Sequence, residues 1–388
     1  MRLSTVQTRA DNQDFLQLPV RLYSHDPNWI QPLNKDVLGV FDPNINKEFR
    51  TGEAERWLLR DEKNQVIGRI AAFFSRKSAD KDNAQPTGGV GFFECIDSQE
   101  AANMLFDVAK EWLISKGMEA MDGPINFGQR DQWWGLLVKG FTEPNYCCNY
   151  HLPYYKALFE NYGFQEYFQQ YTYFLGLKDN LKPSVREKSA KLMAQPGYTF
   201  RCIKKSELKK CAEDFRYIYN KAWVKHKGVG EITSQQAMAI MNKIKPILDP
   251  ELIWFGYHND EPIAFFIMLP EVNQIFKHMK GEFGLLQKIK FLWHKWRGTC
   301  TKIFGVVFGV IPEFQGRGVE SAIVMSFAPI ALSPDFRYKS LELNWIGDFN
   351  PKMLRVCDDI GGELFKTHIT YRYLFDREKP YTRMPIIK

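Results

Sequence analysis

The fold is decided by the stretch Gly309-Val310-Ile311-Pro312-Glu313-Phe314-Gln315-Gly316-Arg317-Gly318-Val319-Glu320-Ser321. The apolar run 303–310 before the turn predicts a buried strand, and 321–332 after it predicts a helix. A strand, a glycine-rich turn and a helix together can form an anion site. Small residues let the backbone approach a phosphate, and the first N–H groups of the helix point at it. The glycine spacing fits neither the Walker phosphate loop nor the dinucleotide-binding fingerprint.

The same stretch resembles the acyl-CoA-binding motif of the GNAT superfamily of N-acyltransferases, which reads Gln/Arg-x-x-Gly-x-Gly/Ala. Gln315 and Gly318 match, whereas Glu320 stands where Gly or Ala is usual, a change that fits the motif if the side chain points outward. The resemblance implies that backbone amides of this loop bind the pyrophosphate of acyl-CoA. The cofactor-binding residues that it implies are Val310, Gln315, Gly316, Arg317, Gly318, Val319, Glu320, Ser321 and Asn350. A plain glycine-rich turn is the alternative interpretation.

The same order of predicted elements occurs twice along the chain. The first half contains a hairpin (56–74), a strand (89–96), a helix capped by Ser98 (98–116), a second helix (155–162) and a strand (171–175). The second half contains a hairpin (252–268), a strand (303–310), a helix (321–332), a strand (340–345), a helix capped by Asn350 (351–360) and a strand (369–375). This is the order of a GNAT domain. The predicted fold is therefore α/β (α+β), with two tandem GNAT-like domains, each a mixed, mostly antiparallel sheet flanked by helices.

The predicted domains are residues 1–185 and 195–388, with the connector 179–197 between them and a basic insert near 271–300 in the second. In the first domain no Gln-x-x-Gly follows the strand, and Asp97 and Glu100 lie where a phosphate would bind. We therefore expect the first domain to lack CoA binding. Over nearly its full length the chain also resembles bacterial two-domain GNAT proteins known as predicted acyltransferases. The matching stretches are 123–126, 135–141, 219–223 and 247–250.

Acylation of an amine needs a positioned thioester, a donor to the developing oxyanion and a base for the amine. The resemblance places the donor at the backbone N–H of Val310 or of its neighbour Gly309. Glu342 and Asn344 alternate on a predicted strand, so both side chains point to one face. Glu342 is the candidate base, directly or through water. A buried structural carboxylate is the alternative for this residue.

Four further features carry weaker signals. We expect His368 at the surface, Tyr371 and Tyr373 in the core, and Cys357 as a buried structural thiol. The polar and aromatic loop 130–134 either lines a substrate cleft shared by the two domains or packs between them.

Composition excludes several classes of protein. The chain is 45% apolar and 25% charged, and no apolar run approaches the ~20 residues that span a bilayer. The first residues resemble no signal peptide and the seven cysteines form no CxxC pair, so we expect a cytoplasmic protein. The histidines show no zinc spacing, and we expect no metal. A net charge of +7 is too mild to indicate nucleic acid. The partners that the GNAT resemblance implies are a CoA thioester and a small amine.

The basic insert holds seven basic and two acidic residues between Glu271 and Lys302. Leu285, Ile289, Leu292 and Trp296 follow a helical spacing and form one apolar face. Two interpretations stay open. The segment 283–297 contacts a membrane or a long acyl chain, or it packs on its own domain with a solvated basic rim.

The favoured function is an acyl-CoA-dependent N-acyltransferase that moves an acetyl or longer acyl group to an amine, with the second domain catalytic. One alternative is a CoA-binding regulator or scaffold without catalysis, because no base is secure. Another is a tRNA-dependent aminoacyl transferase, which also uses doubled GNAT-like domains. The CoA-type loop argues against this last alternative.

Overall fold

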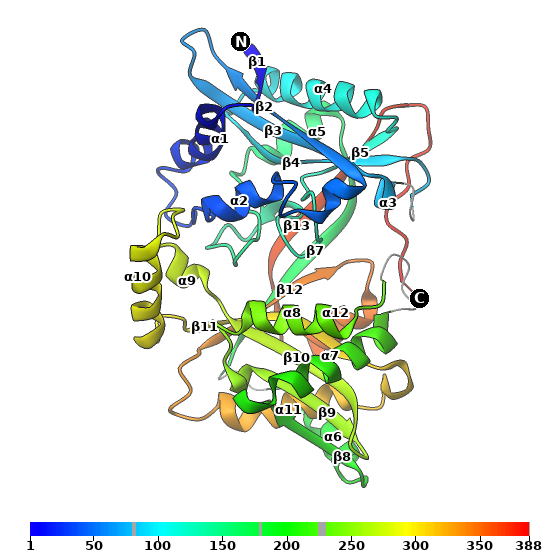
Figure 1. The fold of residues 1–388 in the computed structure, drawn as a ribbon. Helices are drawn as coiled ribbons and strands as arrows, with labels where there is room; N and C mark the ends of the chain where they lie inside the picture. The colour runs from blue at the N-terminus through cyan, green and yellow to red at the C-terminus, as the bar shows by residue number, and fades with distance from the viewer. Residues whose placement is uncertain (80–82, 178–180, 224–229, 388) are drawn as a thin grey trace.

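The computed structural model describes residues 1–79, 83–177, 181–223 and 230–387, and its strands form one 13-stranded sheet (Figure 1). The strand order is β1-β2-β3-β4-β5-β13-β7-β12-β11-β10-β9-β8, with β6 paired to β13. The pairs β4/β5 and β11/β12 are parallel, and the other ladders are antiparallel. The predicted mixed, mostly antiparallel sheet with flanking helices is confirmed.

The first half follows the predicted order and adds elements at its start. Its elements are β1 (Arg2–Thr5), α1 (Arg9–Leu22), α2 (Asn34–Val40), β2 (Gly52–Arg60), β3 (Val66–Ser75), α3 (Arg76–Ala79), β4 (Thr87–Cys95), α4 (Gln99–Ser115), β5 (Ala120–Gly123), β6 (Leu136–Lys139), α5 (Tyr155–Tyr162) and β7 (Gln165–Gly176). The predicted cap is confirmed, because the Ser98 side chain accepts a hydrogen bond from the Ala101 N–H. The hairpin is also confirmed as β2 and β3.

The second half begins in the connector. Its elements are α6 (Pro183–Met193), β8 (Tyr198–Cys202), α7 (Leu208–Trp223), α8 (Ser234–Ile244), β9 (Ile253–His258), β10 (Glu261–Pro270), α9 (Asn273–Phe276), α10 (Leu285–Trp296), β11 (Lys302–Val310), α11 (Val319–Ala331), β12 (Ser340–Gly347), α12 (Pro351–Asp359) and β13 (Glu363–Leu374). Most of the connector is helix α6, which packs against α11, while residues 179 and 180 lie outside the described residues. Asn350 caps α12 as predicted, and β13 starts at Glu363 rather than Ile369.

The last strand of each half completes the sheet of the other half. The chain's final strand, β13, lies between β5 and β7, so it borders the first-half strand β5 directly. Strand β7, from the first half, pairs with β12 of the second half. Figure 1 shows both strands running between the upper and lower parts of the molecule. The order along the chain gave no sign of this exchange.

The hydrophobic cores follow the exchange. Ile369 and Tyr371 of β13 pack in the core of the first half, where Tyr371 contacts the ring of Phe159. Tyr173 of β7 packs in the core of the second half, together with the buried Cys357. Because each core contains side chains from the other half, the two halves depend on each other for stability. The division of the chain at residues 185 and 195 stays a prediction.

The exchange predicts crossed effects of two matched substitutions. Tyr371→Ala should destabilise the protein by about 3–5 kcal/mol, as expected for a buried aromatic, and should speed amide hydrogen exchange in β4 and α4 of the first half. Tyr173→Ala should act mainly on β10 and α11 of the second half. Hydrogen exchange followed by mass spectrometry tests both. If each variant instead loosened the half to which it belongs in sequence, the exchange would be wrong.

Candidate functional site

The first element of the site is the edge of β11 beyond its short ladder with β12. The two strands pair only from Lys302 to Gly305, and β12 continues along β7 to Gly347. Val306 is an extra residue in the ladder with β10, since the pairing shifts between Gly305 and Val307. In the described structure, residues 306–310 therefore have no ladder partner on the side of β12. An unpaired edge of this kind can hydrogen-bond an extended ligand.

The second element is the turn that joins β11 to α11. The Gln315 side chain donates a hydrogen bond to the Val310 carbonyl at 2.9 Å, which ties the turn to the end of the strand. Gly316 and Gly318 have φ values of 70° and 96°, which favour glycine. Gly318 is the N-cap of α11 and has no side chain to accept from the first-turn N–H groups. The structure thus places the predicted motif at a helix N-terminus that is open to an anion.

Glu320 departs from the motif in the structure as well as in the sequence. Its carboxylate does not point outward: Oε1 accepts a long hydrogen bond from the Gly316 N–H, at 3.5 Å. A bound phosphate would meet the negative charge of this side chain. Anion binding at the loop therefore requires the Glu320 side chain to rotate away from Gly316.

The corresponding place in the first half is filled. Beyond the β4/β5 ladder, the Ile125 N–H donates to the Val90 carbonyl at 2.8 Å, so the chain after β5 stays on β4. A Cβ at Gly91 would lie 1.9 Å from the Ile125 carbonyl oxygen, which explains the glycine. The Ser98 side chain occupies the first turn of α4. These contacts close the strand edge and cap the helix in the first half. The corresponding strand edge and helix N-terminus of the second half are both open.

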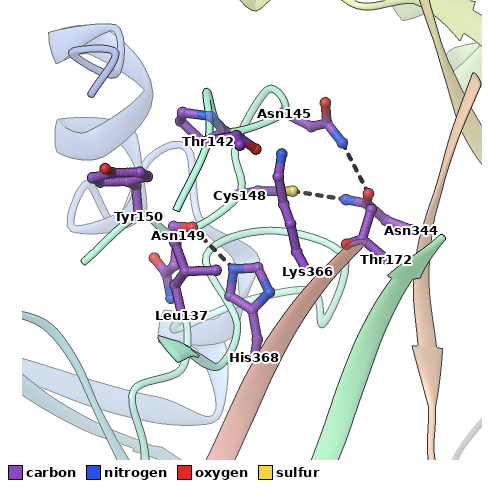
Figure 2. A pocket seen from close by; sticks show the side chains of 11 residues that line it. Leu137, Thr142, Asn145, Cys148, Asn149, Tyr150, Thr172, Asn344, Lys366 and His368 are labelled. Carbon is purple, nitrogen blue, oxygen red and sulfur yellow. Dashed lines mark hydrogen bonds between the residues drawn. The ribbon is translucent and has the colours of Figure 1, made fainter. Parts of the chain in front are cut away.

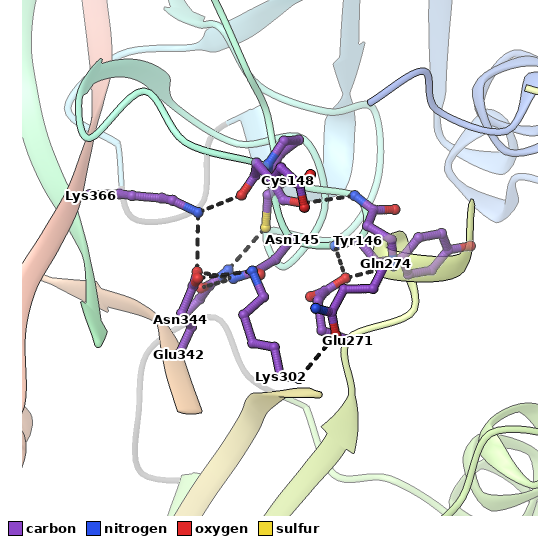
Figure 3. A network of polar contacts seen from close by, with 12 residues as sticks. Asn145, Tyr146, Cys148, Glu271, Gln274, Lys302, Glu342, Asn344 and Lys366 are labelled. Atoms are coloured by element: carbon purple, nitrogen blue, oxygen red, sulfur yellow. Dashed lines mark hydrogen bonds and ion pairs between the residues drawn. The ribbon is translucent and has the colours of Figure 1, made fainter. Parts of the chain in front are cut away.

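Glu342 lies at the centre of a buried polar network (Figure 3). Lys302 Nζ donates to one carboxylate oxygen at 2.9 Å, and Lys366 Nζ donates to the other at 3.1 Å. Asn145 Nδ2 also donates to the second oxygen, at 2.8 Å. Burial raises the pKa of Glu342, but the two ammonium groups outweigh it and hold that pKa below its usual value. The carboxylate is ionised and engaged on both oxygens, which is the geometry of the structural alternative.

Asn344 follows Glu342 on the same face, as predicted. Its Oδ1 accepts from Asn145 Nδ2 at 2.9 Å, and its Nδ2 donates to Cys148 Sγ at 2.9 Å. It lines a cavity of about 10 Å³, space for a single water molecule, whose wall also includes Lys366 and His368 (Figure 2). The first-half loop that carries Asn145 and Cys148 thus closes over the second-half strand β12.

The surface position expected for His368 is wrong. Because β13 lies inside the sheet, His368 is buried, and its Nε2 lies 3.0 Å from the Asn149 carbonyl oxygen. Burial lowers the pKa of His368 to about 4. The imidazole is therefore neutral at physiological pH, and Nε2 carries the hydrogen that the carbonyl accepts.

Glu271, at the end of β10, is a second buried carboxylate that the sequence interpretation missed. Its Oε1 accepts hydrogen bonds from the N–H groups of Tyr146 and Asn273, at 3.0 and 2.8 Å. Its Oε2 has no hydrogen-bond partner among the described residues. Burial raises the pKa of Glu271 to about 7, so the group exchanges its proton near neutral pH. Glu271 and Glu342 are thus neighbours in Figure 3. The pKa of Glu271 is raised above its ordinary value, and the pKa of Glu342 is lowered.

Several network residues had no signal in the sequence. Asn145 and Cys148 belong to an irregular loop, and Lys302 looked like one more charge of the basic insert. Lys366 and His368 share one face of β13, but alternating polar residues normally indicate a solvent face. The loop 130–134 does reach the second half, because the Arg130 carbonyl accepts a hydrogen bond from Trp345 Nε1 at 2.9 Å.

The described residues offer neither a metal cluster nor a membrane-spanning helix. No cluster of three or more His, Cys, Asp or Glu side chains there could hold a metal ion. Nor does that part of the chain contain a helix of the length and apolar character needed to cross a membrane.

Glu271→Gln should stabilise the protein more at about pH 8 than at about pH 5. The folded carboxyl has a pKa of about 7 against an ordinary value of 4.5, so the folded state binds more protons between these values and loses stability as the pH rises. Gln cannot ionise, so the variant does not lose stability in this way as the pH rises. Melting temperatures of both proteins across this range provide the test, with the exposed Glu62→Gln as the control. A pH-independent difference would contradict protonation of Glu271 near neutrality.

Comparison with known proteins gives two relatives in sequence and several neighbours in structure. No family model matches the chain. It is 26% identical over 370 residues to the bacterial ceramide synthase of Caulobacter vibrioides (strain NA1000 / CB15N), covering 94% of this chain and 95% of that protein. It is also 26% identical over 384 residues to protein YghO of Escherichia coli (strain K12), covering 95% and 94% of the two chains.

Solved structures agree on the architecture. A tandem GNAT protein from the clavulanic acid biosynthesis pathway superposes with a TM-score of 0.54 at 10% identity, covering 97% of this chain and all of that one. A GCN5-related glucosamine N-acetyltransferase region of a fungal β-N-acetylglucosaminidase superposes with a TM-score of 0.56 at 12% identity, covering 96% of this chain and 38% of that one. The protein therefore has the fold of tandem GNAT proteins.

Proposed function

We propose that the protein is an acyl-CoA-dependent N-acyltransferase whose second half is catalytic. The observation that carries the proposal is the unpaired edge of β11 at residues 306–310, which leads directly into the uncapped N-terminus of α11. The edge offers backbone hydrogen bonds to a pantetheine arm, and the helix amides offer hydrogen bonds to a pyrophosphate. In the first half the same two features are closed by Ile125 and Ser98.

The backbone of β11 supplies the oxyanion donor in this proposal. Acyl-CoA, when bound, would supply the activated thioester. A backbone N–H at the Val306 end of the unpaired edge then polarises the carbonyl, while Val310 lies beside the arm nearer the anionic loop. The loop residues 315–321 hold the anionic end, and Asn350 orients α12 beside β12 through its cap. Asn344, which lies beyond the end of the β11/β12 ladder, orients the amine.

Two neighbouring carboxylates take different roles in this proposal. Glu342 stays ionised between two ammonium groups and positions Asn344 through their shared contact with Asn145. Glu271, whose pKa lies near 7, accepts the proton of the attacking amine through water as the new C–N bond forms and the thioester C–S bond breaks, and that proton then passes to the departing CoA thiolate. Environments that separate the proton affinities of two acids are typical of sites that need both a fixed charge and a base.

The acceptor is proposed to be a primary amine on a long alkyl chain. The support is the relative named bacterial ceramide synthase, which aligns with this chain over 94% of its length. A ceramide is an N-acylated long-chain amino alcohol, so the same reaction type and acceptor class would serve here. The acyl group ranges from acetyl to longer chains.

A matched pair at Gly316 tests the cofactor site. A Cβ at Gly316 meets nothing within 4 Å, and its φ of 70° is one that Asn and Asp tolerate. Gly316→Asp should weaken CoA binding by roughly tenfold or more relative to Gly316→Asn, because like charges a few ångströms apart repel by about 1–4 kcal/mol. Calorimetry with CoA gives both affinities, and the wild type should show one site per chain. Equal affinities of the two variants, or two equivalent sites, would contradict the proposed location.

Steady-state kinetics test the chemistry. With acyl-CoA thioesters against alkylamines of increasing length, release of free CoA thiol should depend on the amine. Glu271→Gln should lower kcat by about 100- to 10,000-fold, leave the KM of the thioester nearly unchanged and remove the dependence of the rate on a group titrating near pH 7. Glu62→Gln is the control.

The outcomes separate the alternatives. A kcat of Glu271→Gln close to that of the wild type would return the role of base to Glu342 or to water. Binding of CoA with no transfer to any amine would favour a CoA-binding regulator or scaffold.

A further inference from the structure

Helix α10 presents an uncovered apolar face to solvent. Leu285, Leu286 and Trp296 are 76%, 77% and 83% exposed. Ile289, Leu292 and Trp293 are also exposed. Six large apolar side chains on one helix are far more than the isolated exposed residues of an ordinary protein surface. The face needs a partner that removes it from water.

The buried side of α10 fixes this orientation. Phe291 is buried and stacks on Phe276 of α9, with ring centroids 5.6 Å apart. His294 is buried too, and its Nδ1 lies 3.1 Å from Thr299 Oγ1. The helix therefore packs on the protein through a narrow strip that excludes the stripe Leu285, Ile289, Leu292 and Trp296. The helix packs on its own domain through this strip, as one of the two interpretations expected, but the apolar stripe itself lies in solvent.

Basic residues border the apolar face on both sides. With about 3.6 residues per turn, the apolar side chains cover one arc of the helix, and Lys288 and Lys295 fall on one flank of that arc. Lys290 and Arg297 fall on the other flank, and all four are exposed. The helix itself contains no acidic residue. Figure 1 shows α10 at the outer edge of the molecule, where no other element lies over it.

We propose that α10 docks the protein on the surface of an anionic lipid bilayer. The apolar arc, with its two tryptophans, enters the boundary between headgroups and acyl chains, and the flanking ammonium and guanidinium groups contact lipid phosphates. The charge pattern favours this partner. When the apolar strip enters the hydrocarbon layer, the cations on both of its sides lie level with the anionic headgroups. The docking is independent of whether the site transfers an acyl group.

Co-sedimentation of the full-length protein with vesicles tests the proposal. The wild type should bind vesicles of phosphatidylcholine with phosphatidylglycerol at low salt, and binding should fall steeply as salt is added. Binding to pure phosphatidylcholine should be weaker. The triple variant Leu285→Ser, Leu292→Ser and Trp296→Ser should lose binding, and Lys288→Glu with Arg297→Glu should lower the partition coefficient at least about tenfold at low salt.

The substituted side chains are exposed, so the variants lose little buried contact. Their melting temperatures should equal that of the wild type. Lys63→Glu with Arg50→Glu, exposed elsewhere, makes the same change in net charge and should keep binding. Absence of binding to anionic vesicles at low salt would overturn the proposal, as would equal binding by the triple variant. A dimer that the triple variant dissociates, without vesicle binding, would assign the face to a second copy of the chain and overturn the proposal as well.

Discussion

The candidate site depends on the ladder between β11 and β12 ending after Gly305 and Leu343. Two strands that have begun to pair normally continue, because each further hydrogen bond satisfies a buried backbone group. Here each strand is held on its far side: β10 pairs with β11 to Val310, and β7 pairs with β12 to Gly347. The extra residue Val306 turns β11 within its ladder with β10. Strand β7 comes from the first half, so a strand of the other half holds β12 beside the open edge.

The two halves share one topology but differ in whether the strand edge and the helix N-terminus are open. In the second half the edge of β11 stays open and the following helix has no side-chain cap. In the first half the space is closed by Ile125, and a buried cluster of Glu94 with Arg69 and two tyrosines lies at the end of β4. The first half nevertheless contributes to the proposed site, because Asn145 and Cys148 contact Asn344. Its role is to support and cover the second half.

Local features could be predicted from the sequence and long-range ones could not. The caps Ser98 and Asn350 and the turn 315–321 depend on neighbours within a few residues, and the structure contains each of them. The strand exchange depends on pairing between segments about 200 residues apart, for which a single sequence holds no signal. The exchange also explains why the polar face of β13 is buried and does not face solvent. Lys366 and His368 are buried because the strand lies inside the sheet. Glu271 was missed for the same reason, since its burial arises from tertiary packing alone.

A crystal structure of the protein with CoA tests the central claim most directly. The account predicts density for the pyrophosphate against the N–H groups of 316–321, with the Glu320 side chain turned away from Gly316 and the pantetheine arm along residues 306–310 of β11. Density at the start of α4 in the first half, or a pantetheine arm that avoids the edge of β11, would contradict it.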